Sequence, residues 1–305
     1  MGGSGDVVGS AVNAVLVPPQ AKRFAELVGA DLDRLVLNVT GWNKLVLLES
    51  DRVFLFPRSH IGVEWFRREV AAYRALAQTR LSVVPRLLGC WEDPEIYPFP
   101  FAAVTRLRGT VPAEPEALVE QLGHAIATWH ELEPPAFAGS RPPAHHDAAH
   151  HRWLRRALDP ATSPGAAAEA AARLGRPDRA PVWAGVLARA ARLEPVLVHS
   201  DIHEDQLLAE DGRLTGVLDW ETARVDHPFW DFDLGEWGTG LWRRHRREFS
   251  ALWARGWPAY AKARGLDPDS RPVETAFRLR HALRLLDDPG DPAVLGTLEE
   301  HLAHL

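Results

Sequence analysis

The first hundred residues carry short apolar runs in which apolar and polar positions alternate, the two-residue period of β-strands. Predicted strands lie at Leu35–Val39, Leu45–Leu48, Arg52–Phe56, Leu87–Leu88 and Phe101–Val104. Between the third and fourth strands, apolar residues recur three and four positions apart and predict a helix over Val63–Ala77. Helical spacing also marks Ala21–Val28. The part of the chain up to residue 107 therefore predicts a small sheet with one central helix.

After residue 107 the apolar spacing becomes mainly helical. The predicted helices cover Glu116–Leu132, Arg152–Leu158, Ala166–Leu174, Val182–Leu193, Phe232–Trp237, Glu248–Arg264, Val273–Leu286 and Ala293–Leu305, with Pro258 as a candidate kink. A polar connection separates the first two, over Pro134–Asp147. We predict an α+β fold with a flexible leader at 1–20, a β-rich lobe at 21–107 and a larger, mainly helical lobe at 108–305.

One acidic stretch interrupts the helical pattern. The apolar strand Val196–Val198 runs into His199-Ser-Asp-Ile-His-Glu-Asp-Gln206, and two further apolar runs follow, separated by Asp211-Gly212. Asp-Gly between apolar runs is a strong signal for a two-residue hairpin turn. Such a turn would place Gln206 opposite Val217 and bring Asp219, at the end of the second strand, near the loop that begins at Asp201. This arrangement suits the binding of a divalent cation and a reacting group.

Composition narrows the class of protein. Cys90 is the only cysteine, so the chain has no intrachain disulfide and a reducing cytoplasm is expected. No apolar run is long enough to span a bilayer, and the N-terminus shows no signal-peptide pattern. The net charge of −6 disfavours nucleic-acid binding and is compatible with a cationic small-molecule partner.

The order of these motifs resembles the aminoglycoside phosphotransferase family of protein-kinase-like enzymes. In that family a His-Gly-Asp-Leu-His-x-x-Asn loop precedes Ile-Asp-Trp-Glu or Ile-Asp-Phe-Gly, and here Asp201, Gln206 and Asp219-Trp-Glu221 stand in that order. Thr40-Gly41-Trp-Asn43 resembles the nucleotide-facing loop, and Asp226-His-Pro-Phe-Trp-Asp231 resembles the family's Gly-Asp-Pro-x-x-Asp segment. The resemblance covers roughly residues 35 to 260, and the set of motifs is specific although each alone is weak.

The resemblance implies a two-lobed protein-kinase-like fold and roles for the acidic residues. Asp201 is expected to orient a substrate hydroxyl and accept its proton, as phosphoryl transfer requires. Asp219 and Gln206 are the expected Mg²⁺ ligands, because Mg²⁺ prefers oxygen donors. Asp231 is expected to support the loop through backbone N–H groups, and Glu221 either supports the metal site or is a surface acid. His199 and His203 are interpreted as ordering the loop by hydrogen bonds to backbone carbonyls.

Nucleotide binding, to ATP or GTP, is expected from the first lobe. The implied residues are Gly41, Asn43, Lys44, Arg58, Glu69, Thr105 and Leu107. Adenine recognition is assigned to backbone groups near Thr105 to Leu107, and Glu69 stands where the family has a helix glutamate that pairs with a strand cation.

Two positions depart from the family pattern. Gln206 replaces Asn, which keeps the carbonyl oxygen and adds one methylene. Leu55 occupies the position of the lysine or arginine that contacts the nucleotide phosphates and pairs with Glu69. A substitute cation could come from Arg58, Arg52 or Lys44, or the strand register could be shifted by one residue, which would reverse its faces.

The predicted activity is phosphoryl transfer to a hydroxyl of an antibiotic-like small molecule such as an aminoglycoside, macrolide or peptide antibiotic. Asp233, Glu236 and Trp237 are candidates for holding a cationic, ring-containing substrate by charge and stacking. Two alternatives remain open: a metabolic kinase for an amino alcohol or sugar, and a catalytically dead kinase homologue that binds a ligand.

Overall fold

The structure is a computed structural model, and it describes residues 14–38, 43–133, 149–232, 252–288, 298–303 and 305. The chain divides into two compact units. The first contains residues 1–109 and 215–221, and the second contains residues 110–214 and 222–305. Residues 215–221 therefore pack with the first unit. The predicted boundary at residue 107 places them in the second lobe. The Val217 N–H donates to the Val83 carbonyl at 2.7 Å, which ties this segment to the first unit.

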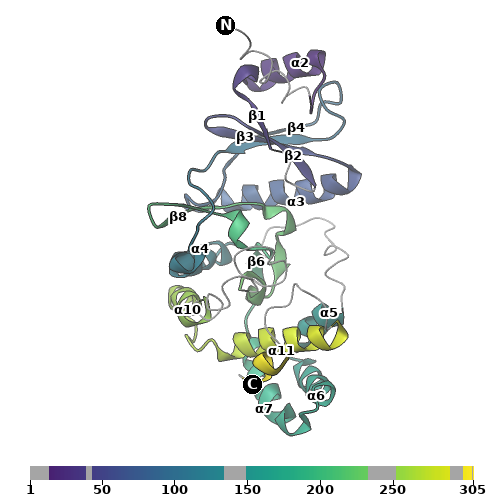
Figure 1. Ribbon diagram of the computed structural model, residues 1–305, viewed down its shortest axis with the longest axis vertical. Helices are drawn as coiled ribbons and strands as arrows, with labels where there is room; N and C mark the ends of the chain where they lie inside the picture. The colour runs from purple at the N-terminus through teal and green to yellow at the C-terminus, as the bar shows by residue number, and fades with distance from the viewer. Residues whose placement is uncertain (1–13, 39–42, 134–148, 233–251, 289–297, 304) are drawn as a thin grey trace. The chain divides into compact units, whose positions relative to one another are not determined.

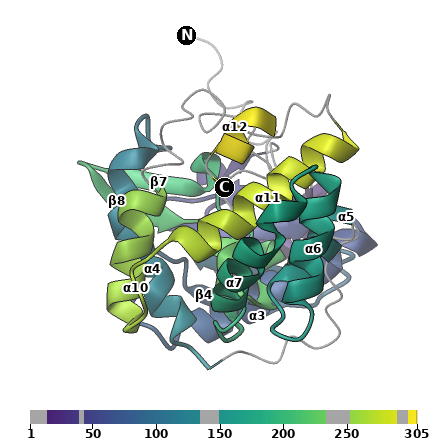
Figure 2. The same ribbon diagram turned by 90° about the horizontal axis from the view of Figure 1, so that it is seen from below.

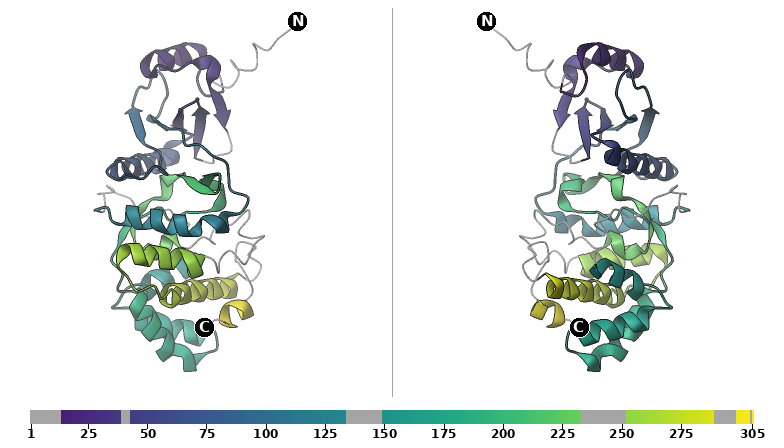
Figure 3. Two further views of the ribbon diagram at one scale, coloured as in Figure 1. Left: turned by 90° about the vertical axis from the view of Figure 1, so that its left-hand side faces the viewer. Right: turned by 90° about the vertical axis from the view of Figure 1, so that its right-hand side faces the viewer.

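The first unit is built on a five-stranded antiparallel sheet in the order β1-β2-β3-β5-β4. The strands are β1 (Val36–Asn38), β2 (Lys44–Leu48), β3 (Arg52–Pro57), β4 (Leu87–Trp91) and β5 (Phe101–Thr105). Helices α2 (Pro18–Val28) and α3 (His60–Leu76) lie on opposite faces of this sheet (Figures 1 and 3). All five predicted strands are present, and their ends agree with the prediction to within one residue, except that β4 continues from Leu88 to Trp91.

Helix α2 covers an aromatic core on one sheet face. The Phe24 ring lies 5.0 Å from Phe54 and 5.6 Å from Phe56, centroid to centroid, and all three side chains are fully buried. Leu16 is also fully buried in this core, and α2 begins at Pro18. The prediction places residues 14–20 in a flexible leader. They instead enter the fold, because the buried Leu16 side chain packs in the aromatic core and α2 begins at Pro18. Residues 1–13 lie outside the described residues.

The register of β2 and β3 decides which side chains face α3. Val46 pairs with Leu55, and Lys44 pairs with Pro57. Side chains alternate along a strand, so these four point to the face opposite the aromatic core. Leu55 is 5% exposed on that face. Residue 55 therefore lies on the α3 side of the sheet, where the family pattern places the cation. The alternative that β3 is shifted by one residue is wrong and does not explain the leucine at position 55.

The start of α3 lies against the beginning of β2. Ser59 caps the helix by accepting a hydrogen bond from the Gly62 N–H at 3.2 Å. A Cβ atom on Gly62 would lie 2.7 Å from the Asn43 carbonyl oxygen, a backbone atom. Glycine thus permits the close approach of helix and strand that positions the inner face of α3.

The second unit is mainly helical. Its helices are α4 (Val119–His130), α5 (Ala149–Ala157), α6 (Ser163–Arg173), α7 (Ala180–Ala190), α10 (Trp257–Arg264), α11 (Arg271–Asp287) and α12 (Leu298–Ala303). Helices α6 and α7 pack side by side, and α11 packs against α7 and α5 (Figure 2). Pro258 lies in the first turn of α10, where proline is tolerated, and a π-helical turn, Leu252–Gly256, precedes it. The predicted helix Glu116–Leu132 begins as a 3₁₀ turn, Pro115–Leu118.

Short strands carry the acidic stretch. Strand β6 (Val196–Val198) pairs with β9 (Arg224–Asp226), and β7 (Leu207–Glu210) pairs with β8 (Arg213–Val217). The turn between β7 and β8 has φ of 50° at Asp211 and 72° at Gly212. Two successive left-handed residues are the signature of the predicted two-residue turn, which is confirmed. In the described part of the chain, no helix combines the length and apolar character needed to cross a bilayer.

Candidate functional site

In the first unit, Lys44 is the centre of a buried ion cluster. Its Nζ lies 2.7 Å from Glu69 Oε2, 2.6 Å from Asp219 Oδ1 and 3.2 Å from Glu221 Oε2. Lys44 is 8% exposed and Glu69 is 1% exposed. Three predicted site residues, Lys44, Glu69 and Asp219, are thus brought together. Glu221 joins them and is no isolated surface acid.

The structure distinguishes the three candidates for a substitute cation. Lys44 reaches Glu69. Arg52 lies at the other end of β3, where it contacts Glu49 and donates to the Val28 carbonyl at 2.8 Å. Arg58 is exposed, and its Nε donates to the Lys44 carbonyl at 3.2 Å. Lys44 therefore occupies the place opposite Glu69, and Arg58 holds its backbone.

Burial and the surrounding charges shift the pKa values of Glu69 and Lys44 in this cluster. Burial raises the pKa of Glu69 to about 7, although the Lys44 ammonium opposes this shift. The Tyr73 hydroxyl donates to Glu69 Oε1 at 2.8 Å and satisfies its second oxygen. Burial alone would lower the pKa of Lys44, but Asp219, Glu69 and Glu221 together hold it well above its usual value. Lys44 is therefore charged at neutral pH.

This cluster offers suitable donors for a divalent cation. One carboxylate oxygen from each of Glu69, Asp219 and Glu221 lies within 4.8 Å of the others. Three carboxyl groups surround one ammonium, and a divalent cation would offset the negative charge that the single ammonium leaves unbalanced. Oxygen donors of this kind fit Mg²⁺. The Asp219 side chain is 35% exposed, so it is accessible to an ion from solvent.

The remaining residues predicted for nucleotide binding lie around β2 and the end of β5. Asn43 Nδ2 donates to Glu221 Oε1 at 2.8 Å, which ties the start of β2 to the Asp219-Trp-Glu221 segment. The Thr105 hydroxyl oxygen accepts from the Arg86 N–H at 2.9 Å, and Leu107 is half-buried. Gly41 lies outside the described residues.

In the second unit, Asp201 lies in the loop after β6 and is half-buried. Gln206 Nε2 donates to Asp201 Oδ2 at 3.2 Å. Gln206 Oε1 is buried and has no hydrogen-bond partner among the residues that the structure describes. A buried carbonyl oxygen without a donor fits a cation ligand, since its desolvation is otherwise uncompensated.

A hydrogen bond to His199 orders the loop backbone. His199 Nδ1 accepts a hydrogen bond from the Asp201 N–H at 3.3 Å, and the bonds of His199 and His203 to backbone carbonyls stay a prediction. The tight turn at Ser200, which has φ of 66°, presents the Asp201 N–H to the ring. The Ser200 Oγ donates to the Thr222 carbonyl at 2.9 Å and accepts from Arg224 Nη1 at 2.6 Å.

Asp231 supports this loop through a backbone N–H group, as predicted. Its Oδ1 accepts from the Ser200 N–H at 2.7 Å, and its Oδ2 accepts from Trp129 Nε1 at 2.8 Å and lies 2.9 Å from His130 Nε2. Burial would raise the pKa of Asp231, but hydrogen bonds led by that from His130 lower it below its ordinary value. Burial lowers the pKa of His130. Sequence analysis missed Trp129 and His130, because they lie on α4, about a hundred residues before Asp231, and carry no local signal.

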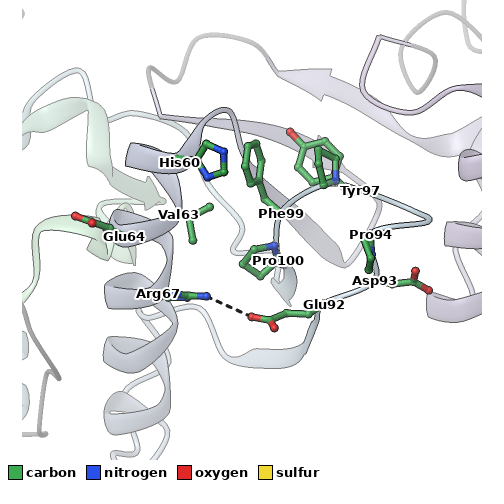
Figure 4. Close-up of a pocket in the computed structure, with 11 residues that line it drawn as sticks. His60, Val63, Glu64, Arg67, Glu92, Asp93, Pro94, Tyr97, Phe99 and Pro100 are labelled. Atoms are coloured by element: carbon green, nitrogen blue, oxygen red, sulfur yellow. Dashed lines mark ion pairs between the residues drawn. The ribbon is translucent and has the colours of Figure 1, made fainter.

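The three residues predicted to hold a substrate, Asp233, Glu236 and Trp237, lie outside the described residues. The first unit also contains a cavity of about 520 Å³ between α3 and the segment after β4 (Figure 4). An ion pair of 3.7 Å between Arg67 and Glu92 crosses its wall. None of the residues predicted for catalysis, metal or nucleotide lines this cavity, so it is separate from the candidate site.

Comparison with known proteins identifies the family. Residues 41–273 match the phosphotransferase enzyme family. The solved aminoglycoside phosphotransferase APH(2'')-Ib, bound to ADP, is 14% identical with a TM-score of 0.53, and 95% of each chain is covered. The macrolide 2'-phosphotransferase MphH of Brachybacterium faecium is 21% identical with a TM-score of 0.51, covering 93% of this chain and 96% of that one. No curated protein sequence matches. The fold is the predicted protein-kinase-like α+β fold, and the chain belongs to the phosphotransferase enzyme family.

Proposed function

We propose that this protein transfers the γ-phosphoryl group of ATP or GTP to a hydroxyl of an antibiotic-like small molecule. The observation that carries the proposal is the contact of Lys44 with both Glu69 and Asp219, at 2.7 and 2.6 Å. The alternative of a catalytically dead homologue rests on Leu55 and Gln206 together. Lys44 places a cation opposite Glu69, which supports an active enzyme despite Leu55.

Asp201 is the proposed catalytic base. Asp231 holds the backbone at Ser200, the residue before Asp201. The Gln206 amide donates a hydrogen bond to Asp201 Oδ2. A carboxylate fixed in this way can accept a hydrogen bond from a substrate hydroxyl, orient it in line with the γ-phosphate and take its proton. Gln206 uses its amide N–H on Asp201 and leaves its carbonyl oxygen available.

Asp219 and Gln206 are the proposed Mg²⁺ ligands, with Glu221 and Glu69 adding negative charge next to Asp219. Bound Mg²⁺ would neutralise phosphate oxygens during transfer. Residues of the first unit would bind the nucleotide: Gly41, Asn43, Lys44, Arg58, Glu69, Thr105 and Leu107.

The proposed acceptor class follows from the relatives. Solved structures similar to this chain include a streptomycin–ATP ternary complex and a gentamicin complex of APH(2'')-IIa, with TM-scores of 0.54, as well as the macrolide enzyme. The net charge of −6 suits cationic acceptors of this kind, and Asp233, Glu236 and Trp237 are the proposed contacts.

The test is a phosphoryl-transfer assay with labelled ATP and GTP, Mg²⁺ and a panel of aminoglycosides, macrolides, peptide antibiotics, amino alcohols and sugars. Asp201→Asn should reduce turnover by roughly 10²–10⁴-fold while nucleotide affinity is retained. Asp205→Asn, an exposed acid in the same loop, is the matched control and should keep full turnover. Turnover confined to amino alcohols or sugars would favour the metabolic kinase, and equal activity of Asp201→Asn would refute the assigned base.

A further inference from the structure

The position expected to hold a phosphate-binding cation, residue 55, contains a buried leucine. In the β2–β3 pair, Leu55 stands opposite Val46, and Lys44 stands opposite Pro57. All four side chains point to the α3 side of the sheet. Positions 44 and 55 are therefore diagonal neighbours on one face, on adjacent strands, a separation that a lysine side chain can span.

We propose that Lys44 is a relocated phosphate-binding lysine: β2 supplies the cation that β3 lacks, and the ammonium reaches the same place through a different strand. This inference rests on the proposed kinase function and adds to it a specific residue that makes nucleotide binding possible without a cation at position 55. The phosphates of a nucleoside triphosphate are the ligand that Lys44 would contact.

Three contacts give Lys44 a fixed position for this role. Glu69 Oε2 receives its ammonium at 2.7 Å, while Tyr73 occupies the other Glu69 oxygen. The Arg58 side chain and backbone N–H hold the carbonyls of Lys44 and Asn43, at 3.2 and 2.8 Å. Lys44 also contacts Asp219, the proposed metal ligand, so one ammonium lies next to both the helix glutamate and the ion-binding carboxylate.

A relocated lysine has a further consequence for the resting cluster. Lys44 is shared by Glu69, Asp219 and Glu221, whose summed charge exceeds its own. Incoming phosphates would add negative charge to a cluster that already has an excess of it. Phosphate binding at Lys44 is therefore expected to need a divalent cation on the carboxylates, which reduces the repulsion.

The test moves the lysine between strands. Calorimetry should first show whether the wild type binds Mg²⁺–ATP or Mg²⁺–GTP. The affinities of wild type, Lys44→Met, Leu55→Lys and the double variant are then compared for the nucleotide that binds and for its nucleoside, for example ATP and adenosine. Lys44→Met should weaken ATP binding by at least about tenfold and leave adenosine binding unchanged, because only the phosphates lose a charge-assisted contact. Lys44→Met with Leu55→Lys should recover most of the lost ATP affinity, since the new ammonium reaches the same face. Lys22→Met, at an exposed lysine of α2, is the matched control and should bind as wild type does.

The outcomes separate the inference from the function on which it rests. No ATP or GTP binding by the wild-type protein would overturn the proposed function itself. Wild-type binding with an unaffected Lys44→Met would overturn the relocated lysine alone, as would an equal loss of adenosine and ATP affinity. If Lys44→Met does not fold because Glu69 is left unpaired, Lys44→Met with Glu69→Gln removes that carboxylate. The same selective loss of ATP affinity is then expected, and full ATP affinity would overturn the inference.

Discussion

At the scale of single residues, the acidic segment holds unusual backbone conformations. Ser200 has φ of 66° and Asp219 has φ of 65°, values that residues with a side chain adopt at a cost. Ser200 directly precedes Asp201, the proposed base, so its conformation sets the position of that residue. The conformation of Asp219 brings its own carboxylate to Lys44. In the His-Gly-Asp motif of the aminoglycoside phosphotransferases, glycine stands at the position of Ser200. Here the serine hydroxyl offsets the cost through bonds to the Thr222 carbonyl and to Arg224.

Substitution of Ser200 separates the backbone cost from the hydroxyl contacts. Ser200→Gly and Ser200→Ala both remove the hydrogen bonds, so both should be less stable than wild type. Only glycine relieves the left-handed conformation, so Ser200→Ala should be the less stable of the two by about 1–2 kcal/mol. Urea unfolding of the three proteins measures this order. Equal stability of the two variants would show that the φ value carries no cost.

His227 makes the folded state sensitive to acid. It lies before the 3₁₀ turn Pro228–Asp231, accepts from the Phe229 N–H through Nδ1 at 3.0 Å and donates through Nε2 to the Ala190 carbonyl at 2.9 Å. The bond at Nδ1 requires the neutral ring, because a protonated Nδ1 would face another donor, whereas Nε2 can donate in either protonation state. Burial lowers the pKa of His227 to about 4, below its unfolded value of about 6.5. The stabilising effect of the neutral ring is therefore complete above pH of about 6.5 and is lost as the pH falls toward 4.

The His227→Asn variant tests this sign. Asparagine keeps a side-chain acceptor for the Phe229 N–H and does not titrate. The wild-type free energy of unfolding should fall more steeply than that of the variant between pH of about 6.5 and 4. Denaturant titrations at several pH values give both curves, and parallel curves would rule out His227 as the titrating group.

At the scale of elements, glycines show where helices need close contact. Gly123 lies within α4, and a Cβ there would stand 2.3 Å from the Gly256 carbonyl oxygen, just before α10. Gly185 lies within α7, and no atom of the described residues is within 4 Å of its Cβ position. The α4–α10 contact matters for the site because α4 carries Trp129 and His130, which hold Asp231.

The two glycines predict opposite effects of the same substitution. Gly123→Ala should destabilise the protein by about 1–3 kcal/mol, because a backbone atom must move to admit the methyl group. Gly185→Ala should stabilise it by about 0.5–1 kcal/mol through helix propensity alone. Thermal unfolding measured side by side gives the comparison. A stabilising Gly123→Ala would contradict the close approach of the two helices.

Elements with a local signal could be predicted, and those defined by distant partners could not. The strand β3 and the Asp211-Gly212 turn follow from alternation and turn chemistry. Strand β9 was missed because Arg224–Asp226 contains one apolar residue and is a strand through its pairing with β6. The predicted helix begins at Ala21, whereas α2 begins at Pro18, because proline is accepted in a first helical turn.

At the scale of the whole molecule, motif order and the hairpin selected Asp201 and Asp219 as the proposed base and the proposed metal ligand. The identity of the cation opposite Glu69 depended on strand register, and three candidates remained open. The β2–β3 pairing and the α3 contact resolve it in favour of Lys44. The supports of Asp231 could not be predicted, because no spacing rule joins α4 to a residue so far along the chain.

The central claim is that the chain phosphorylates a small-molecule hydroxyl with Asp201 as base. The most direct measurement is mass spectrometry of the antibiotic panel after incubation with the protein, Mg²⁺ and ATP or GTP. We predict an acceptor heavier by one phosphoryl group, formed by the wild type and by Asp205→Asn and lost with Asp201→Asn. Nucleotide binding without any phosphorylated acceptor across the panel, or equal product from Asp201→Asn, would contradict the account.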